Sequence, residues 1–154
     1  MKSVDHVGIA VADLDEARRT WDALLGQTPV VEDVPSQKVR TATYPCGIEL
    51  VAPASPESPI ARFLGKRGPG IHHVTLVVDD INAHLARLKA QGTKLVNETP
   101  VKGAGGSPVA FLHPVGGVLV ELKEKRGPRG PSGSAEARKE RRRAPEAPSD
   151  REKR

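Results

Sequence analysis

Hydrophobic and polar residues follow the same order in two stretches of the chain. HVGIAVADLDEARRTWDALLG begins at His6, and HVTLVVDDINAHLARLKAQG begins at His73, an offset of 67 residues. Alternation with a period of two is typical of a strand, and the apolar spacing of three and four residues that follows is typical of an amphipathic helix. The pattern therefore predicts a strand followed by a helix in each of the two stretches.

An Asp stands at the junction between strand and helix in each copy. Asp13 is the predicted N-cap of the first helix, with Glu16 three residues later as in a capping box, and Asp80 takes the same place in the second copy. The expected buried helix faces are Leu14, Ala17, Trp21 and Leu24 or Leu25 in the first copy, and Ile81, Leu85 and Leu88 in the second.

Three further strand candidates follow each helix. They are Pro29–Glu32, Gln37–Tyr44 and Ile48–Ala52 in the first copy, and Lys94–Glu98, Pro108–Leu112 and Gly117–Lys123 in the second. The sequence thus predicts an α+β fold of two tandem βαβββ modules that form a curled mixed sheet around a pocket. We expect one domain at 1–125, with module one at 3–54, a linker at 55–69 that holds a short helix at Pro59–Lys66, and module two at 70–125.

The excess positive charge lies outside this domain. Residues 126–154 carry ten Lys or Arg against five Asp or Glu, whereas the remaining 125 residues carry fourteen of each sign. This segment has no Val, Leu, Ile or aromatic residue, so we expect a disordered basic tail. Its run Arg138–Arg143 offers a contact for nucleic acid or an acidic partner, but a solvated appendage is the expectation. The neutral domain gives no indication of nucleic acid binding.

Little in the composition suggests export or a membrane. The N-terminus has acidic residues within its apolar stretch, unlike a signal peptide, and no apolar run is long enough to span a bilayer. The single cysteine, Cys46, excludes an internal disulfide and fits a reducing compartment. We therefore expect a cytoplasmic protein.

Four ionisable residues recur at matching places in the two copies. His6 and His73 begin the first strands, and Glu49 and Glu121 lie in the last strands. All four alternate with Val, Ile or Leu, so they share the strand face opposite to those neighbours. A buried carboxylate needs a compensating cation, and two imidazoles with two carboxylates suit Zn, Co, Ni, Mn or Fe. We therefore expect one divalent metal ion held by His6, Glu49, His73 and Glu121.

Other polar positions are weaker candidates. His72 should point to the opposite strand face from His73 and act as an outer-shell or packing residue. His84 is expected on the helix surface, and His113, which precedes Pro114 in a turn, could reach the pocket but is expected to have no role there. The glycine-rich stretch Val101–Gly117 lacks the GK[ST] ending of a phosphate-binding loop. It predicts either a flexible loop over the pocket or simple hairpin turns.

The repeated βαβββ modules with His, Glu, His and Glu resemble the vicinal oxygen chelate superfamily, and within it the methylmalonyl-CoA epimerase family. The stretches that carry the resemblance are DHVGIAV, SPIARFL, GIHHVTLVVDDI, KGAGGSPVAFLHP and GGVLVEL, within residues 4–123. The resemblance implies metal ligands at His6, Glu49, His73 and Glu121, an acyl-CoA substrate and a homodimer. Many members carry Gln where Glu49 stands.

The implied activity is a metal-dependent isomerase that moves the α-proton of methylmalonyl-CoA through an enolate. Glu121 and Glu49 are the candidate acid and base, and Thr41 stands where some bacterial members place a further Glu. The alternatives are a glyoxalase I-like isomerase acting on a thiol adduct, and a non-catalytic small-molecule-binding module of the resistance type. An extradiol dioxygenase is disfavoured because such sites usually need only two His and one Glu.

Overall fold

Eight strands form one continuous mixed sheet in the computed structural model, which describes residues 3–125. Their order across the sheet is β2-β3-β4-β1-β5-β8-β7-β6. The strands are β1 (Ser3–Ala10), β2 (Val30–Val34), β3 (Val39–Thr43), β4 (Ile48–Pro53), β5 (Gly70–Val78), β6 (Val101–Lys102), β7 (Pro108–Val115) and β8 (Val118–Glu124). The predicted α+β fold is confirmed, and the expected tail at 126–154 lies outside the described residues.

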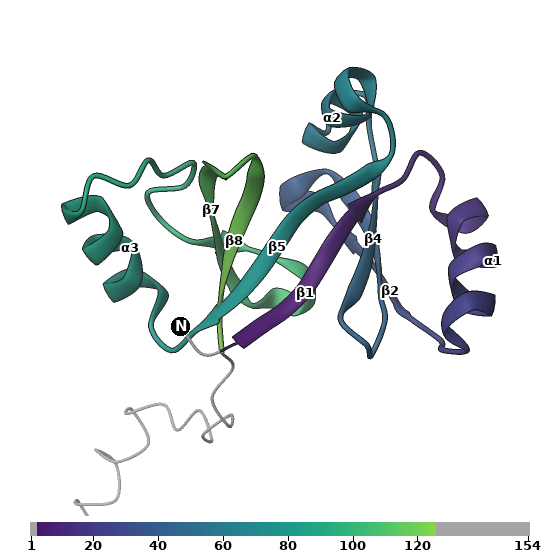
Figure 1. Ribbon diagram of the computed structural model, residues 1–154, viewed down its shortest axis with the longest axis horizontal. Helices are drawn as coiled ribbons and strands as arrows, with labels where there is room; N and C mark the ends of the chain where they lie inside the picture. Colours follow the sequence, from purple (N-terminus) through teal and green to yellow (C-terminus); the bar gives the residue numbers. More distant parts are fainter. Residues whose placement is uncertain (1–2, 126–154) are drawn as a thin grey trace, which may run out of the picture.

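The two halves of the sheet repeat each other. β1 pairs in parallel with β4, and β5 pairs in parallel with β8. The halves join where β1 and β5 run antiparallel. Figure 1 shows these two strands side by side at the centre, with helices α1 (Leu14–Leu25) and α3 (Ile81–Ala90) at opposite ends of the molecule. The predicted order of strand, helix and three strands therefore holds in both copies.

The two helices begin and pack as their sequences indicate. The Asp13 carboxylate accepts the backbone N–H of Glu16 at 2.8 Å, and the Asp80 carboxylate accepts that of Ala83 at 2.9 Å. Each bond satisfies a backbone donor that the first helical turn leaves free. The sequence left open whether Leu24 or Leu25 belongs to the buried face of α1. Leu25 packs against the core whereas Leu24 is 70% exposed, so the buried residue is Leu25.

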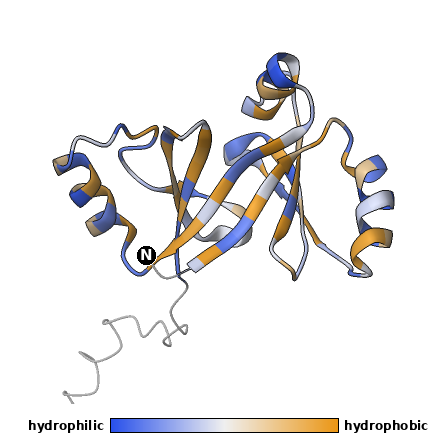
Figure 2. Ribbon diagram, viewed as in Figure 1, coloured by the Kyte–Doolittle hydropathy of each residue, from blue (hydrophilic) through white to orange (hydrophobic). Residues whose placement is uncertain are grey.

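Each half-sheet is covered on one face by its own helix. The first core places Leu14 of α1 against Ala42, Leu50 and Ala52 of the strands, and the second places Ile81 and Leu85 of α3 against Ala110, Leu112 and Leu122. Figure 2 shows hydrophobic and hydrophilic positions alternating along β1 and β5. Because the helices bury the apolar face, polar side chains at the alternate positions of the central strands lie on the other face.

A short helix joins the two halves. α2 spans Pro59–Arg67, one residue longer than the predicted Pro59–Lys66, so that prediction is confirmed. Ser58, fully buried, caps it by accepting the backbone N–H of Ile60 at 3.2 Å.

None of the helices within residues 3–125 is long and apolar enough to cross a membrane.

One predicted strand is wrong. Residues 94–98 form a single isolated bridge, Leu95 to Leu112, and the short strand β6 lies further along the chain. The backbone N–H groups of Val96 and Asn97 both donate to the same carbonyl of Phe111, and the Asn97 side chain accepts the Phe111 N–H. A side-chain amide thus replaces a backbone partner, which prevents a regular ladder.

Candidate metal centre

The four predicted ligands come from four adjacent strands. Glu49 lies on β4, His6 on β1, His73 on β5 and Glu121 on β8, which are neighbours in the order β4-β1-β5-β8. Their exposed fractions are 5%, 5%, 4% and 6%. The sheet therefore brings the repeated pairs of the two halves to its middle and removes all four side chains from solvent.

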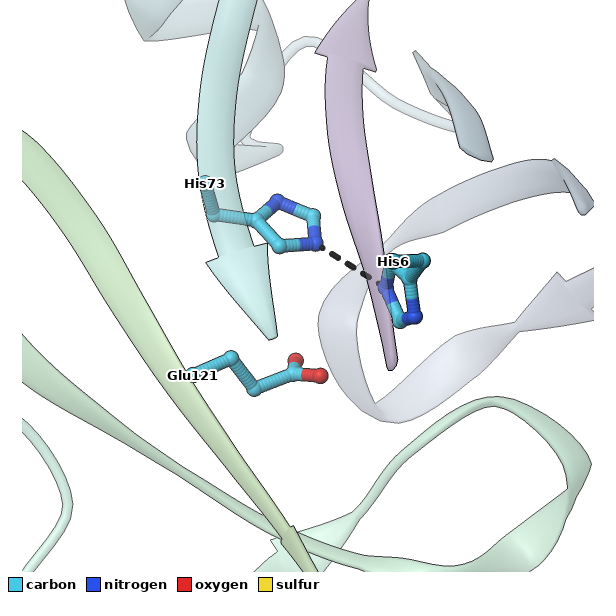
Figure 3. Close-up of side chains that lie close together, drawn as sticks. All are labelled: His6, His73 and Glu121. Carbon is cyan, nitrogen blue, oxygen red and sulfur yellow. Dashed lines mark hydrogen bonds between the residues drawn. The ribbon is translucent and has the colours of Figure 1, made fainter. Parts of the chain in front are cut away.

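The side-chain nitrogen and oxygen atoms of three of the predicted ligands lie close together. The Nε2 atoms of His6 and His73 are 3.3 Å apart, and Figure 3 shows these rings and the Glu121 carboxylate projecting from three strands toward a shared space. One nitrogen or oxygen from each of these three residues lies within 4.8 Å of the others. Glu49 reaches the same region, with Oε2 at 3.2 Å from His6 Nε2 and 3.7 Å from His73 Nε2.

Two threonine hydroxyls orient the carboxylates. Thr75 donates to Oε1 of Glu121 at 3.1 Å, and its hydroxyl also lies 3.0 Å from Nε2 of His6. Thr43 donates to Oε1 of Glu49 at 2.9 Å. Each carboxylate is therefore held through Oε1 by a neighbouring strand residue. Neither threonine was predicted, because an isolated Thr in a strand carries no sequence signal for this role.

Burial and charge act in opposite directions on the first His–Glu pair. Burial lowers the pKa of His6, but its hydrogen bonds with Asp5 and Glu49 outweigh burial and raise that pKa to about 9. Burial raises the pKa of Glu49, yet the hydrogen bond and charge of His6 hold it below its usual range. Without a bound cation, the proton on His6 is the positive charge nearest to Glu49.

The second pair, His73 and Glu121, has no protonated imidazole of its own. Burial is the main cause that lowers the pKa of His73 to about 3, and the neighbouring imidazoles lower it further. Burial also raises the pKa of Glu121 to about 7, and the charge of Glu49 adds to this effect. His73 is therefore neutral near pH 7, and the Glu121 carboxyl keeps a proton for part of the time.

The donor set fits a divalent cation. Two imidazole nitrogens 3.3 Å apart cannot both carry a proton on the facing side, and two buried carboxylates need compensating charge. A cation between the nitrogens would replace the proton of His6 and meet both needs. Mixed imidazole and carboxylate ligands suit Zn, Co, Ni, Mn or Fe without selecting among them.

A glycine makes room for one of the imidazoles. Gly8 of β1 lies opposite His73 in the β1–β5 register, and a Cβ on Gly8 would lie 2.0 Å from Cε1 of His73. No side chain can replace hydrogen there while the ring keeps its place. The close approach of the ring to the backbone explains why residue 8 is a glycine, a requirement that the sequence alone does not indicate.

A cavity of about 350 Å³ opens over the cluster. His6, Glu49, His73 and Glu121 all line it. Thr41, expected at a functional place, also lines it, and is only 3% exposed with a hydroxyl that has no hydrogen-bond partner within residues 3–125. His113 is exposed, as expected of a residue with no ligand role.

The glycine-rich stretch forms one edge of this cavity. Its middle is a 3-10 turn at Ala104–Gly106, and Ala104 and Gly105 line the cavity. The backbone N–H of Gly105 donates to both carboxylate oxygens of Glu32, each at 2.8 Å, so the second half of the chain is tied to β2 of the first. The predicted hairpin turns are present, because residues 103–107 connect the antiparallel strands β6 and β7 and Gly116–Gly117 connect β7 and β8. The first of these turns borders the cavity.

The chain matches the Glyoxalase/Bleomycin resistance protein/Dioxygenase superfamily over residues 5–111. The chain belongs to this superfamily. An ethylmalonyl-CoA/methylmalonyl-CoA epimerase from Cereibacter sphaeroides is 41% identical over 79% of this chain and 96% of its own length. This relationship makes the chain a member of the methylmalonyl-CoA epimerase family of isomerases.

Solved structures agree with this membership. The methylmalonyl-CoA epimerase of Mycobacterium tuberculosis is 44% identical, with a TM-score of 0.75 over 80% of this chain and 88% of that one. Another methylmalonyl-CoA epimerase, in complex with methylmalonyl-CoA and NH4+, is 31% identical, with a TM-score of 0.74 over 79% of this chain and 93% of that one. The family suggested by the sequence motifs is therefore confirmed.

Proposed function

We propose that this chain epimerises methylmalonyl-CoA by moving the proton on the carbon between the thioester and the carboxylate. The observation that carries the proposal is the convergence of two buried imidazoles and two buried carboxylates at the floor of one cavity. The complex of a family member with methylmalonyl-CoA supports the choice of an acyl-CoA substrate.

We assign His6, Glu49, His73 and Glu121 as the residues that hold a divalent cation. When bound, the cation would supply a Lewis acid that stabilises negative charge on the substrate oxygens as the α-proton leaves. His6, His73 and Glu121 each offer an atom within 4.8 Å of the others, and the two threonine hydroxyls orient the carboxylates of Glu121 and Glu49.

Glu121 is the stronger candidate for the group that takes and returns the proton. In the metal-free chain burial raises its pKa to about 7, whereas the pKa of Glu49 is lowered, so Glu121 is the carboxyl that takes up a proton more readily near neutral pH. Glu49 remains the second carboxylate of the proposed pair. Its lowered pKa and its bond from Thr43 favour the ionised form, which suits a ligand and a base better than an acid.

Thr41 contributes a hydrogen bond to the substrate in this proposal. Its hydroxyl is buried in the cavity wall and lacks a partner within the described residues, which is costly unless a ligand supplies one. A side-chain rotation would let it donate to a carboxylate or thioester oxygen. Thr41 cannot act as a base at neutral pH, so its role is to position the substrate.

A second cavity provides room for the rest of an acyl thioester. It measures about 280 Å³, and its walls include Ile60, Val101, Phe111 and Leu119. It shares Gln37, Val51 and His73 with the first cavity, so the two meet beside the cluster. The pantetheine arm of the thioester could therefore lie in one cavity while the reacting carbon lies in the other.

We also infer a homodimer, as the family resemblance implies. Val4 on β1 and Ile71 on β5 are 60% and 63% exposed, which leaves apolar surface on the two central strands. Burial of such side chains on association is favourable. Light scattering of the purified chain tests this inference directly.

The decisive assay is exchange of the α-proton in D₂O. We expect the metal-loaded chain to introduce deuterium into methylmalonyl-CoA and to interconvert its two epimers, and we expect chelator-treated chain to lose both activities until metal is restored. Ethylmalonyl-CoA in a parallel reaction measures the tolerance for a longer side chain. Absence of exchange together with turnover of a glutathione hemithioacetal would replace the proposal with a glyoxalase I-like reaction.

A further inference from the structure

Both histidines of the cluster follow an extra residue in their strands. On β1, Val4 pairs with Leu76 and His6 pairs with Thr75, so Asp5 is an additional residue that no β5 position opposes. On β5, Gly8 pairs with His73 and Ile9 pairs with Ile71, so His72 is additional in the same way. Each extra residue is a β-bulge, and bulges re-aim side chains.

The first bulge lets Asp5 contact its neighbour His6. In a regular strand, adjacent side chains point to opposite faces and could not meet. Here Oδ2 of Asp5 accepts the Nδ1–H of His6 at 2.7 Å, and the same oxygen accepts from the Lys123 ammonium at 2.8 Å. The bond fixes the proton of His6 on Nδ1, and the free electron pair of the neutral ring then lies on Nε2, toward Glu49 and His73.

The second bulge gives His73 a weaker partner. Nδ1 of His72 lies 3.0 Å from Nδ1 of His73, and the His72 ring packs edge-on against Phe63 at a centroid distance of 4.9 Å. If Nε2 of His73 is the ligating atom, its Nδ1 carries the proton and donates to His72. The prediction that His72 points to the opposite face is wrong because the bulge turns it.

We infer that Asp5 and His72 are positioning residues that hold the two ligand imidazoles with Nε2 toward the metal, and that Asp5, supported by Lys123, contributes more. This inference rests on the proposed metal site. A hydrogen bond to a carboxylate is shorter and stronger than one to a neutral nitrogen, and 2.7 Å against 3.0 Å agrees with that order. Outer partners of this kind orient metal ligands and raise their basicity.

The test measures Co²⁺ binding to chelator-treated chain by calorimetry at one fixed pH. Asp5→Ala should weaken binding by about 10- to 100-fold, whereas His72→Phe, which keeps the ring against Phe63, should weaken it less. Asp5→Asn should lie between Asp5→Ala and the wild type, because an amide oxygen still accepts the Nδ1–H. Lys123→Met should resemble Asp5→Asn. The matched control is Asp33→Asn, an exposed carboxylate paired with Arg40, which should bind as the wild type does.

A second readout separates positioning from simple loss of stability. Long-range ¹⁵N–¹H spectra of the metal-free chain, recorded above pH 9 where the His6 ring is neutral, should show its proton on Nδ1 in the wild type and a mixture of Nδ1 and Nε2 forms in Asp5→Ala. Wild-type affinity and tautomer in a folded Asp5→Ala or Asp5→Asn would overturn the inference and leave the metal site intact. A wild-type chain that binds no Co²⁺ would overturn the metal site and the inference together, while exchange in D₂O tests the epimerase reaction independently.

Discussion

Gly8 and His73 face each other across the β1–β5 pair at a distance that excludes any side chain on Gly8. A Cβ there would lie 2.0 Å from Cε1, 2.4 Å from Nδ1 and 2.5 Å from Nε2 of the imidazole. The ring therefore rests on the backbone of the neighbouring strand. The position of the His73 ring therefore depends on a residue without a side chain, Gly8, in the other half of the chain.

Gly8→Ala should displace His73 and weaken divalent metal binding by about 10-fold or more, comparable to the loss of an outer-shell contact. Circular dichroism should show that the sheet persists, because the substitution suits a strand. The matched control is Gly65→Ala in α2, where an added Cβ meets nothing within 4 Å. Gly65→Ala should leave metal affinity unchanged and stabilise the fold by about 0.5–1 kcal/mol. Unchanged affinity in Gly8→Ala would contradict the assigned position of the ring.

Glu121→Gln should lower the rate of α-proton exchange by about 10²- to 10⁴-fold, since an amide of the same shape can neither take nor return a proton. Part of the loss should come from weaker metal binding, so the rate is compared at saturating metal. Glu98→Gln, with a side chain 68% exposed and paired to Lys89, provides a control in which only a surface charge is removed. Exchange at the wild-type rate in metal-saturated Glu121→Gln would assign the proton transfer to another residue.

Metal binding should strengthen as the pH rises toward about 9. A bound cation must displace the proton of His6, whose pKa is raised to about 9, and that of Glu121, whose pKa is raised to about 7. Each displaced proton changes the apparent affinity by about tenfold per pH unit. The slope should therefore approach two decades per unit below pH 7 and one decade between pH 7 and 9. Affinity that stays constant from pH 6 to 9 would exclude proton displacement at these residues.

The metal-free chain should lose stability as the pH rises from about 6.5 to 9. The folded chain holds the His6 proton up to about pH 9, whereas the unfolded chain releases it near the ordinary imidazole pKa of 6.5, so folding binds protons across this window. Glu121 acts in the same direction between 4.5 and about 7. Below 6.5, His73 opposes them because its folded pKa of about 3 lies under the unfolded value. Thermal melts of chelator-treated chain at pH 7 and 9 measure the effect, and a higher melting temperature at pH 9 would contradict it.

The cluster of His6, Glu49, His73 and Glu121 could be predicted from the sequence because the His and Glu positions occur in both copies of the repeat. A single strand His or Glu is ambiguous, but His6 with His73 and Glu49 with Glu121 occupy equal places in two units with the same order of elements. Alternation then places each residue on the face that the helix does not cover. The helix caps at Asp13 and Asp80 followed from equally local patterns.

The contacts around the ligands could not be predicted, because they depend on how distant strands align. The bulges at Asp5 and His72 are visible only in the register between β1 and β5. The clearance at Gly8 likewise arises from the residue opposite to it. For the same reason the Lys94–Glu98 strand was predicted wrongly. Leu95 and Val96 are apolar residues as in a short strand, but the Asn97 side chain accepts the backbone N–H of Phe111 that a partner strand would need.

The seam between β1 and β5 divides the proposed ligands evenly, with His6 and Glu49 on one side and His73 and Glu121 on the other. Neither half can hold the ion with more than two ligands. Because the metal ion binds only when the two halves are associated, the free energy of metal binding stabilises their association by mass action. Cutting the chain between the modules would abolish the site, and adding metal to a mixture of the two pieces would favour their reassembly.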